Sequence, residues 1–231
     1  VARDDERVDL RSEDRHGREG TRCPDGQSRR LGRRHAESIT LWVILEAMQI
    51  IDPQGNLVGD DPGLDPGIYQ AMYRNMVLAR ELDRRMLALQ RQGRIGTYAM
   101  LEGHEAVQIG SAMALRPDDF VFPSYREHGV QITHGLPIDV LLAYWRGLPN
   151  SGWDVEKYRT GIVTVPIASQ LPHAVGYSYY RRLLGDDTVT AVYFGDGATS
   201  EIDFHSGMNF AGVWKTPTVF VCANNLYAIS V

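Results

Sequence analysis

Two apolar segments near the C-terminal end of the sequence constrain the fold most strongly. Residues 188–194 and 217–223 are rich in β-branched and aromatic residues, and Gly, Asp, Asn or Pro bounds each segment. Between them, residues 200–214 have the apolar spacing of a helix. Strand, helix and strand within about 35 residues are typical of a right-handed βαβ unit with two parallel strands. The sequence therefore predicts an α/β fold built on a parallel sheet.

Upstream of this unit the pattern is mainly helical. Asp65 is a suitable N-cap and Pro66 suits a first helical turn, and apolar residues then recur at helical spacing until Gly93. The short apolar segment 48–51, followed by a turn at 52–55, predicts a strand and a turn. The further helices that we expect cover residues 102–115, 137–145 and 166–184.

The N-terminal segment has a different composition. Residues 1–37 contain ten arginines and nine acidic residues, with almost no large apolar side chains. Such a segment buries too little surface to offset the entropy lost on ordering. We therefore expect residues 1–40 to be a disordered or non-native tail, and residues 41–231 to form the folded domain.

Overall composition excludes several classes of protein. The 231 residues are 43% hydrophobic and 23% charged, as in ordinary globular proteins. A net charge of −5 argues against nucleic-acid binding. The longest apolar run, residues 41–51, is interrupted by Glu46 and Gln49 and is shorter than the roughly 20 residues that a membrane span needs. Two cysteines make no disulfide framework, so we expect a cytoplasmic protein.

Polar residues follow both predicted strands. Gly195-Asp196-Gly197 comes directly after the first strand, and Asn225 and Tyr227 follow the second. Parallel strands bring their carboxyl ends to one edge of the sheet, where α/β proteins bind ligands. The glycines allow an anion to approach the backbone, and one carboxylate with two neutral oxygens suits Mg²⁺ bound to a diphosphate. The alternative is that these residues form an ordinary turn and loop.

Longer stretches of the sequence resemble a known family. Gly195-Asp196-Gly197, followed after 26 residues by Asn224-Asn225, resembles the thiamine diphosphate motif. Four stretches are similar to the α subunit of the decarboxylating first component of 2-oxo acid dehydrogenase complexes. They are LQRQGRIGTYAMLEGHEAVQIGSAMAL, VFPSYREHGV, PIASQLPHAVG and GDGATSEIDFHSGMNFAGVWKTPTVFVCANNLYAISV. The resemblance covers residues 48–231. It implies a thiamine diphosphate-binding fold, with a central parallel sheet flanked by helices and additional N-terminal helices.

The resemblance also implies roles for nine residues. The Mg²⁺ ligands that it implies are Asp196, Asn225 and the backbone carbonyl of Tyr227. The residues that would contact the diphosphate are Tyr125, Arg126, Gly197 and Ala198. Those that would lie near the aminopyrimidine are Val165 and Ile167.

Two further assignments have equally plain structural alternatives. Thr164, Ser169 and Gln170 resemble a monovalent-cation site of branched-chain members, but they also suit the start of a helix. His128 lies next to the Tyr125-Arg126 pair and is the candidate catalytic histidine, whereas a single histidine is often a buried structural residue.

The activity implied by the resemblance is that of an oxidoreductase acting on the oxo group of 2-oxo acids with a disulfide acceptor. We expect a pyruvate dehydrogenase α subunit, which would decarboxylate pyruvate and pass the acyl group to the lipoyl group of an acyltransferase component. Its partner would be a β subunit, in a heterotetramer of two α and two β subunits, and this chain alone would be inactive. Branched-chain 2-oxo acids and acetoin are alternative substrates. An inactive, truncated α/β binding module is the alternative from a different class.

The sequence departs from the family pattern at three positions. Ile202 stands where a glycine is usual, and a β-branched residue there would strain a permissive turn. Asn150 lies in a stretch where some relatives carry a substrate-handling histidine. The chain also stops at Val231, before family members end, so we expect a C-terminally truncated sequence.

Overall fold

The computed structural model describes residues 49–149, 151–225 and 227. Contacts divide the chain into two units, Val1–Asp60 and Asp61–Val231. In the first unit, Ile51 and Leu57 form an antiparallel bridge around a turn, and the Asp52 carboxylate accepts hydrogen bonds from the N–H groups of Gln54 and Asn56. The turn predicted at 52–55 is therefore confirmed. Predictions for residues 1–40, Met48 and Asn150 concern residues outside the described part.

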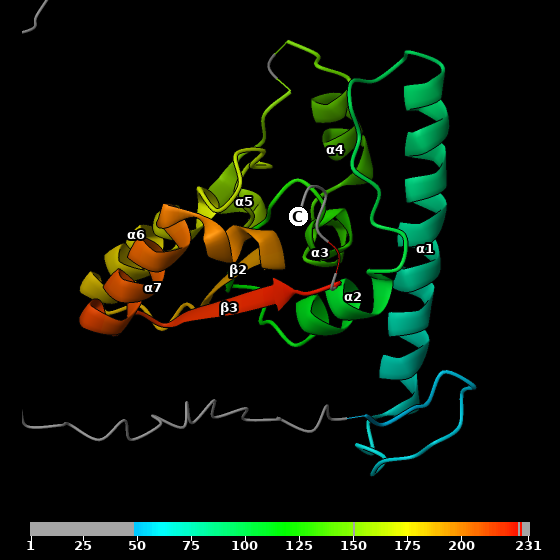
Figure 1. Ribbon diagram of the computed structural model, residues 1–231, viewed down its shortest axis with the longest axis horizontal. Helices are drawn as coiled ribbons and strands as arrows, with labels where there is room; N and C mark the ends of the chain where they lie inside the picture. Colours follow the sequence, from blue (N-terminus) through cyan, green and yellow to red (C-terminus); the bar gives the residue numbers. More distant parts are fainter. Residues whose placement is uncertain (1–48, 150, 226, 228–231) are drawn as a thin grey trace, which may run out of the picture. The chain divides into compact units, whose positions relative to one another are not determined.

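The second unit contains every helix and strand of the described residues (Figure 1). In chain order they are α1 (Pro66–Arg91), α2 (Glu105–Met113), β1 (Phe120–Phe122), α3 (His128–Thr133), α4 (Ile138–Trp145), α5 (Val155–Tyr158), α6 (Gln170–Leu183), β2 (Thr190–Gly195), the 3-10 helix η1 (Asp196–Ser200), α7 (Ile202–Trp214) and β3 (Thr218–Ala223). No helix among the described residues is long and apolar enough to cross a membrane.

The sheet is parallel, with strand order β1-β2-β3. Phe122 is level with Val192, and Gly195 is level with Ala223. The α/β prediction and the predicted pair of parallel strands are confirmed, and the structure adds β1 as a third strand. All three strands therefore end at the same edge of the sheet, which we call the carboxyl edge.

Helices cover both faces of the sheet. On one face, Val192 and Phe194 of β2 pack against Leu171 and Ala174 of α6. On the other face, the apolar side chains come from α2, α3 and the strands, and they are Ala112, Val121, Val130, Ala191 and Tyr193. This layered packing is the arrangement expected for a central parallel sheet flanked by helices.

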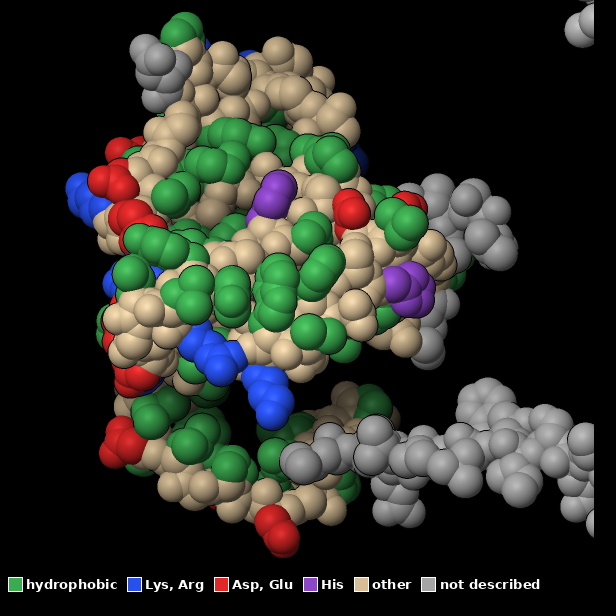
Figure 2. All heavy atoms as spheres, turned by 90° about the vertical axis from the view of Figure 1, so that its left-hand side faces the viewer, with side chains coloured by type: hydrophobic (Ala, Val, Ile, Leu, Met, Phe, Trp, Pro, Cys, Tyr) green, Lys and Arg blue, Asp and Glu red, His purple; other side chains and the backbone are tan. Residues whose placement is uncertain are grey.

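Helices α6 and α7 cross closely at a glycine. A Cβ on Gly207 would lie 3.2 Å from Leu171 Cβ, so the small residue permits the contact. The exposed large apolar side chains of α7 include Ile202, Met208 and Val213. Figure 2 shows hydrophobic side chains gathered on this side of the molecule.

The long helix α1 begins as its sequence predicts. The Asp65 carboxylate accepts a hydrogen bond from Gly67 N at 2.7 Å, and Pro66 occupies the first turn. The buried side chains of α1 recur at positions i, i+3, i+4 and i+7, and they are Ala79, Leu82, Asp83 and Met86. A charged residue therefore lies on the buried face of the helix.

Two helices begin later than predicted, and each has a local reason. Helix α2 starts at Glu105 because Gly103 adopts a φ of 93° and the N–H groups of Leu101 and Glu102 bond to Asp83. Helix α6 starts at Gln170 rather than at residue 166 because Ala168 has a φ of 67°, which interrupts a right-handed helix.

Candidate functional site

The candidate site lies where the three strands end. The segment after β1 carries Tyr125 and Arg126, the segment after β2 carries Asp196 and Gly197, and the segment after β3 carries Asn225. Because β1, β2 and β3 are adjacent and parallel, these three segments leave the sheet at its carboxyl edge. The edge is where open α/β sheets bind ligands.

After β2 the chain turns directly into η1. Asp196 is the first residue of this short helix, and Ala198 is buried in the core beside Phe194. The Asp196 carboxylate is only partly buried, and no hydrogen bond or ion pair found among the described residues involves it. A Cβ on Gly197 would meet no atom within 4 Å, so the space beside this backbone is open. An unpartnered carboxylate beside open backbone suits a cation-bound anion.

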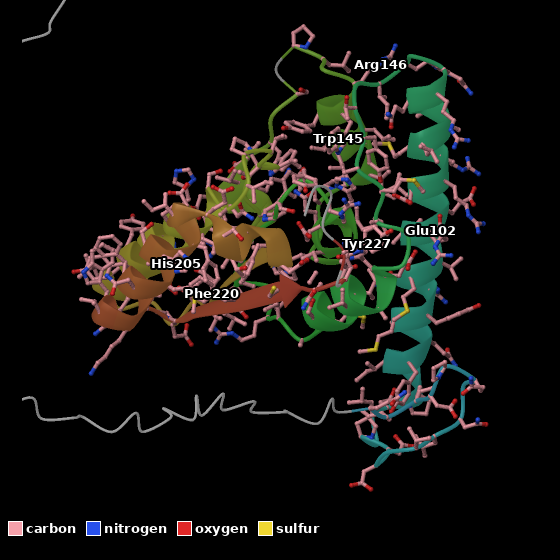
Figure 3. The ribbon with its side chains drawn as sticks, viewed as in Figure 1. Glu102, Trp145, Arg146, His205, Phe220 and Tyr227 are labelled. Carbon is pink, nitrogen blue, oxygen red and sulfur yellow. The ribbon has the colours of Figure 1, made fainter. Side chains whose placement is uncertain are left out.

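After β3, Asn225 and Tyr227 are joined by a hydrogen bond. Tyr227 N donates a hydrogen bond to the Asn225 amide oxygen at 2.9 Å. The Tyr227 side chain is exposed beyond the end of the strand, and Phe220 lies within the strand (Figure 3). Since Gly195 is level with Ala223, Asp196 and Asn225 follow the two strands at nearly the same height. Asn225 thus follows β3 close to the height at which Asp196 follows β2, and the Tyr227 carbonyl stays a predicted ligand.

After β1 the chain is held by a buried glutamate. Glu127 is almost fully buried, and its carboxylate accepts a hydrogen bond from Ser124 N at 2.7 Å. The Arg126 guanidinium donates a hydrogen bond to the Met100 carbonyl, and it lies 5.7 Å from the ring centroid of Tyr125. The backbone next to Arg126 is therefore held by Glu127, and the end of its side chain is held by the Met100 carbonyl. The other N–H groups of the guanidinium are able to bind an anion.

The segment before α6 presents apolar side chains. Val165 is 60% exposed and Ile167 is 52% exposed, whereas Ala168 is buried against Val192 and Phe194. The left-handed conformation of Ala168 is unusual for a residue with a side chain and has an energetic cost. The turn at Ala168 thus packs against β2, the strand that precedes Asp196. The side chains of Val165 and Ile167 remain exposed next to this turn.

The hydrogen bonds of Thr164, Ser169 and Gln170 describe the segment before α6. The Ser169 hydroxyl donates to the Pro166 carbonyl at 2.8 Å and makes no capping hydrogen bond at the start of α6. Gln170 donates from Nε2 to the Tyr193 carbonyl at 2.8 Å, but its buried Oε1 has no hydrogen-bond partner among the described residues. Thr164 donates to the Ile162 carbonyl. Ser169 therefore occupies the N-cap position of α6 without a side-chain capping bond, and the buried Oε1 of the neighbouring Gln170 has no donor among the described residues.

His128 lies inside the protein rather than at the edge. Its ring is 1% exposed, stacks on Tyr98 at 5.1 Å between centroids, and meets Trp145 edge-on at 5.3 Å. Burial lowers the pKa of His128 from its ordinary value of 6.5 to about 3, so the ring is neutral at physiological pH. The structure thus shows a buried, stacked ring, and the catalytic role of His128 stays a prediction.

Two residues that sequence reasoning missed support this edge. Gln108 is buried, donates to the Arg126 carbonyl at 3.1 Å and accepts from Gly129 N at 2.9 Å. Asp83 is also buried, and it holds the segment that contains Met100. A signal for Asp83 exists in the sequence, since helical spacing puts it on the apolar face of α1.

Two expectations are tested by simpler observations. Ile202 is exposed and is not among the described non-glycine residues with positive φ, so the expected backbone strain at this position is absent. Within the described part of the chain, no group of three or more His, Cys, Asp or Glu side chains could hold a metal ion. The donor set that the sequence predicts at the carboxyl edge instead has one carboxylate with neutral oxygens, which would fit Mg²⁺ shared with a diphosphate.

The fold and the edge together define an α/β protein whose candidate ligand site lies at the ends of parallel strands. The model of the family described as "Dehydrogenase E1 component" matches residues 73–231 of the sequence. The chain therefore belongs to the dehydrogenase E1 component family.

Several known relatives are α subunits of 2-oxo acid dehydrogenases. A 3-methyl-2-oxobutanoate dehydrogenase subunit alpha of Mycobacterium tuberculosis is 39% identical over 202 residues, which are 86% of this chain and 55% of the relative. A pyruvate dehydrogenase E1 component subunit alpha of Bacillus cereus is 37% identical over 187 residues, or 80% of this chain and 50% of the relative. A mitochondrial 2-oxoisovalerate dehydrogenase subunit alpha of Dictyostelium discoideum is 40% identical over 195 residues, or 78% of this chain and 44% of the relative. The chain thus spans about half the length of these relatives.

Proposed function

We propose that this chain is the α subunit of a thiamine diphosphate-dependent 2-oxo acid dehydrogenase. The observation that carries the proposal is that the three segments with the candidate binding residues leave the sheet at its carboxyl edge, in a chain of the dehydrogenase E1 component family. The cofactor, when bound, supplies the carbon nucleophile and accepts the electrons released as CO₂ leaves. A β subunit would complete the site, and a lipoyl-bearing acyltransferase component would receive the acyl group.

The residues of this chain would bind the diphosphate half of the cofactor. Asp196, the Asn225 amide oxygen and the Tyr227 carbonyl would hold Mg²⁺, whose charge would neutralise the diphosphate. Arg126 would bind diphosphate oxygens through its remaining N–H groups, and the open backbone at Gly197 would approach the same anion. Tyr125 and Ala198 would complete the contacts on either side.

The apolar side chains before α6 would hold the other end of the cofactor. Val165 and Ile167 are exposed in this structure and would pack on the aminopyrimidine ring, which excludes water from it. The buried Oε1 of Gln170 supports a monovalent cation beside Ser169 and Thr164. We expect K⁺ to raise the melting temperature of the full chain relative to choline chloride, and Ser169→Ala to abolish that difference. An equal response of both proteins would contradict the cation site.

Binding of thiamine diphosphate tests the proposed function directly. The full chain, assembled with its β subunit, is titrated with the cofactor in a calorimeter with and without Mg²⁺. We expect Mg²⁺-dependent binding that Asp196→Ala weakens on the order of 100-fold, because a metal ligand is lost. The matched control is Glu201→Ala, an exposed acidic residue a few positions further on, which should bind as wild type does. Equal binding by wild type and Asp196→Ala would overturn the metal assignment.

The proposed substrate is pyruvate, supported by the sequence stretch from Leu89 to Ala99 and by the Bacillus cereus relative. The second candidate is 3-methyl-2-oxobutanoate, which the Mycobacterium tuberculosis relative favours. Acetoin is a further candidate. Turnover of the assembled enzyme on the three compounds decides among them, and faster turnover of the branched acid than of pyruvate would reverse the preference. Absence of any Mg²⁺-dependent binding would favour an inactive binding module instead.

A further inference from the structure

The buried carboxylate of Asp83 anchors the segment between α1 and α2. It accepts hydrogen bonds from Tyr98 Oη at 2.8 Å, from Leu101 N at 2.8 Å and from Glu102 N at 3.3 Å. The side chain is fully buried, so it depends on these donors for the stabilisation that water would otherwise provide. Figure 3 shows Glu102 beside α1, from which Asp83 comes. The backbone from residue 98 to residue 102 is therefore fixed against the helix.

Met100 lies within this fixed segment. Its carbonyl accepts a hydrogen bond from the Arg126 guanidinium. The residues that bond to Asp83 lie on both sides of Met100 along the chain, so Asp83 determines where this carbonyl can be. A guanidinium has five N–H donors, and the bond to Met100 uses one of them.

The backbone of Arg126 is held by a separate contact. Gln108 Nε2 donates to the Arg126 carbonyl at 3.1 Å, and Gln108 Oε1 accepts from Gly129 N at 2.9 Å. Gln108 thus fixes the main chain of Arg126, whereas the Met100 carbonyl fixes the far end of its side chain. A long side chain held at both ends loses less conformational entropy when it binds a ligand.

We propose that Asp83 is a positioning residue for Arg126. It fixes the Met100 carbonyl, which holds the guanidinium so that its remaining donors meet an anion at the carboxyl edge without rearrangement. Asp83 itself touches no ligand. The identity of the anion, the diphosphate of thiamine diphosphate, rests on the function proposed above.

The first test compares two buried carboxylates. In Asp83→Asn one acceptor oxygen becomes an N–H donor that faces backbone N–H groups, and we expect cofactor affinity to fall roughly tenfold. Asp119→Asn is the matched control, because Asp119 is also buried and accepts from Val189 N and Arg116 N, before β1 rather than after it. Its affinity should equal that of wild type, measured calorimetrically on the full chain assembled with its β subunit. Equal weakening by both substitutions would overturn the proposal.

A double-mutant cycle then asks whether Asp83 acts through Arg126. Arg126→Lys removes the donor fork, and Asp83→Asn should weaken binding less than about twofold further in that background. A full tenfold loss in both backgrounds would contradict the proposal. Should Asp83→Asn fail to fold, Tyr98→Phe takes its place in the cycle, since it removes one donor to Asp83 and keeps the ring.

A third readout needs no cofactor. The rate at which phenylglyoxal modifies Arg126, followed by peptide mass spectrometry, should rise in Asp83→Asn and stay unchanged in Asp119→Asn. An unchanged rate in Asp83→Asn would overturn the positioning role. If wild type bound no thiamine diphosphate, the proposed function would fail, while this rate would still decide whether Asp83 positions Arg126.

Discussion

The two ends of the sheet differ in how one carboxylate is paired. Before β1 and β2, at the amino edge, Asp119 is paired with polar groups around it. The carboxylate of Asp119 accepts from Val189 N at 2.9 Å and from Arg116 N at 2.8 Å, and Arg116 also pairs with Asp187 at 2.9 Å. At the carboxyl edge, the Asp196 carboxylate has no hydrogen-bond or ion-pair partner among the described residues.

This difference separates stability from ligand binding. Paired polar groups at the amino edge hold the start of β1 to the start of β2, whereas an unpaired carboxylate adds little to the folded state by itself. An unpartnered charge is useful where a cation is to be bound. We therefore expect substitutions at the amino edge to change the free energy of unfolding, and substitutions at the carboxyl edge to change binding.

The largest effect is expected for Asp119→Ala. It leaves the N–H groups of Val189 and Arg116 without their acceptor, so the free energy of unfolding should fall by about 3 kcal/mol. Urea denaturation of the full chain measures it. The matched control is Asp118→Ala, whose exposed carboxylate lies 3.6 Å from Arg116 and should contribute less than about 0.5 kcal/mol. Equal losses for the two variants would refute a special role for the buried carboxylate.

The second prediction concerns pH. Burial alone would raise the pKa of Asp119, but hydrogen bonds from Val189 N and from Arg116 outweigh it and hold the pKa below its ordinary value of 3.8. The charged carboxylate therefore stabilises the fold above that value, and this contribution is lost as the pH falls through the lowered pKa. The difference in unfolding free energy between wild type and Asp119→Asn should be largest near pH 6 and shrink below about pH 4. A difference in unfolding free energy that stayed constant from pH 6 to pH 3 would argue against a stabilising contribution from the charge of Asp119.

Local sequence patterns predict the residues at the carboxyl edge better than they predict the residues that hold this edge in place. Asp196 and Asn225 follow directly from two strands that the sequence marks clearly, because strand ends of a parallel sheet must meet at one edge. The three-residue strand β1 is too short to have a recognisable period, so the alignment of Arg126 with that edge comes only from the fold.

Contacts between distant residues explain the rest. Asp83 can be predicted to be buried from its helical phase, but its partners lie 15 to 19 residues further along the chain. The late starts of α2 and α6 likewise depend on the bonds to Asp83 and on the left-handed turn at Ala168, which no local propensity indicates. For α2, the tertiary contact with Asp83 overrides the helical pattern. For α6, the left-handed turn at Ala168 packs against β2.

A smaller and opposite effect is expected just before β3. Lys215 ends α7 with a φ of 50°, a left-handed conformation that glycine adopts without strain. Lys215→Gly should therefore raise the free energy of unfolding by about 0.7 kcal/mol, after allowance for the greater freedom of glycine in the unfolded chain. Lys215→Ala retains the strain and serves as the control, with no expected gain. Stabilisation by alanine as large as by glycine would show that the conformation is not responsible.

The smallest effect on stability is expected for Asp196→Ala at the carboxyl edge. Because its carboxylate has no hydrogen-bond or ion-pair partner within the described residues, removing it should change the free energy of unfolding by less than about 0.5 kcal/mol when no cofactor or Mg²⁺ is present. The same substitution from Asp to Ala at residue 119 is expected to cost at least about six times as much. Urea denaturation of both variants in one buffer makes the comparison. A loss at Asp196 as large as that at Asp119 would mean that both edges serve stability, and the division between them would not hold.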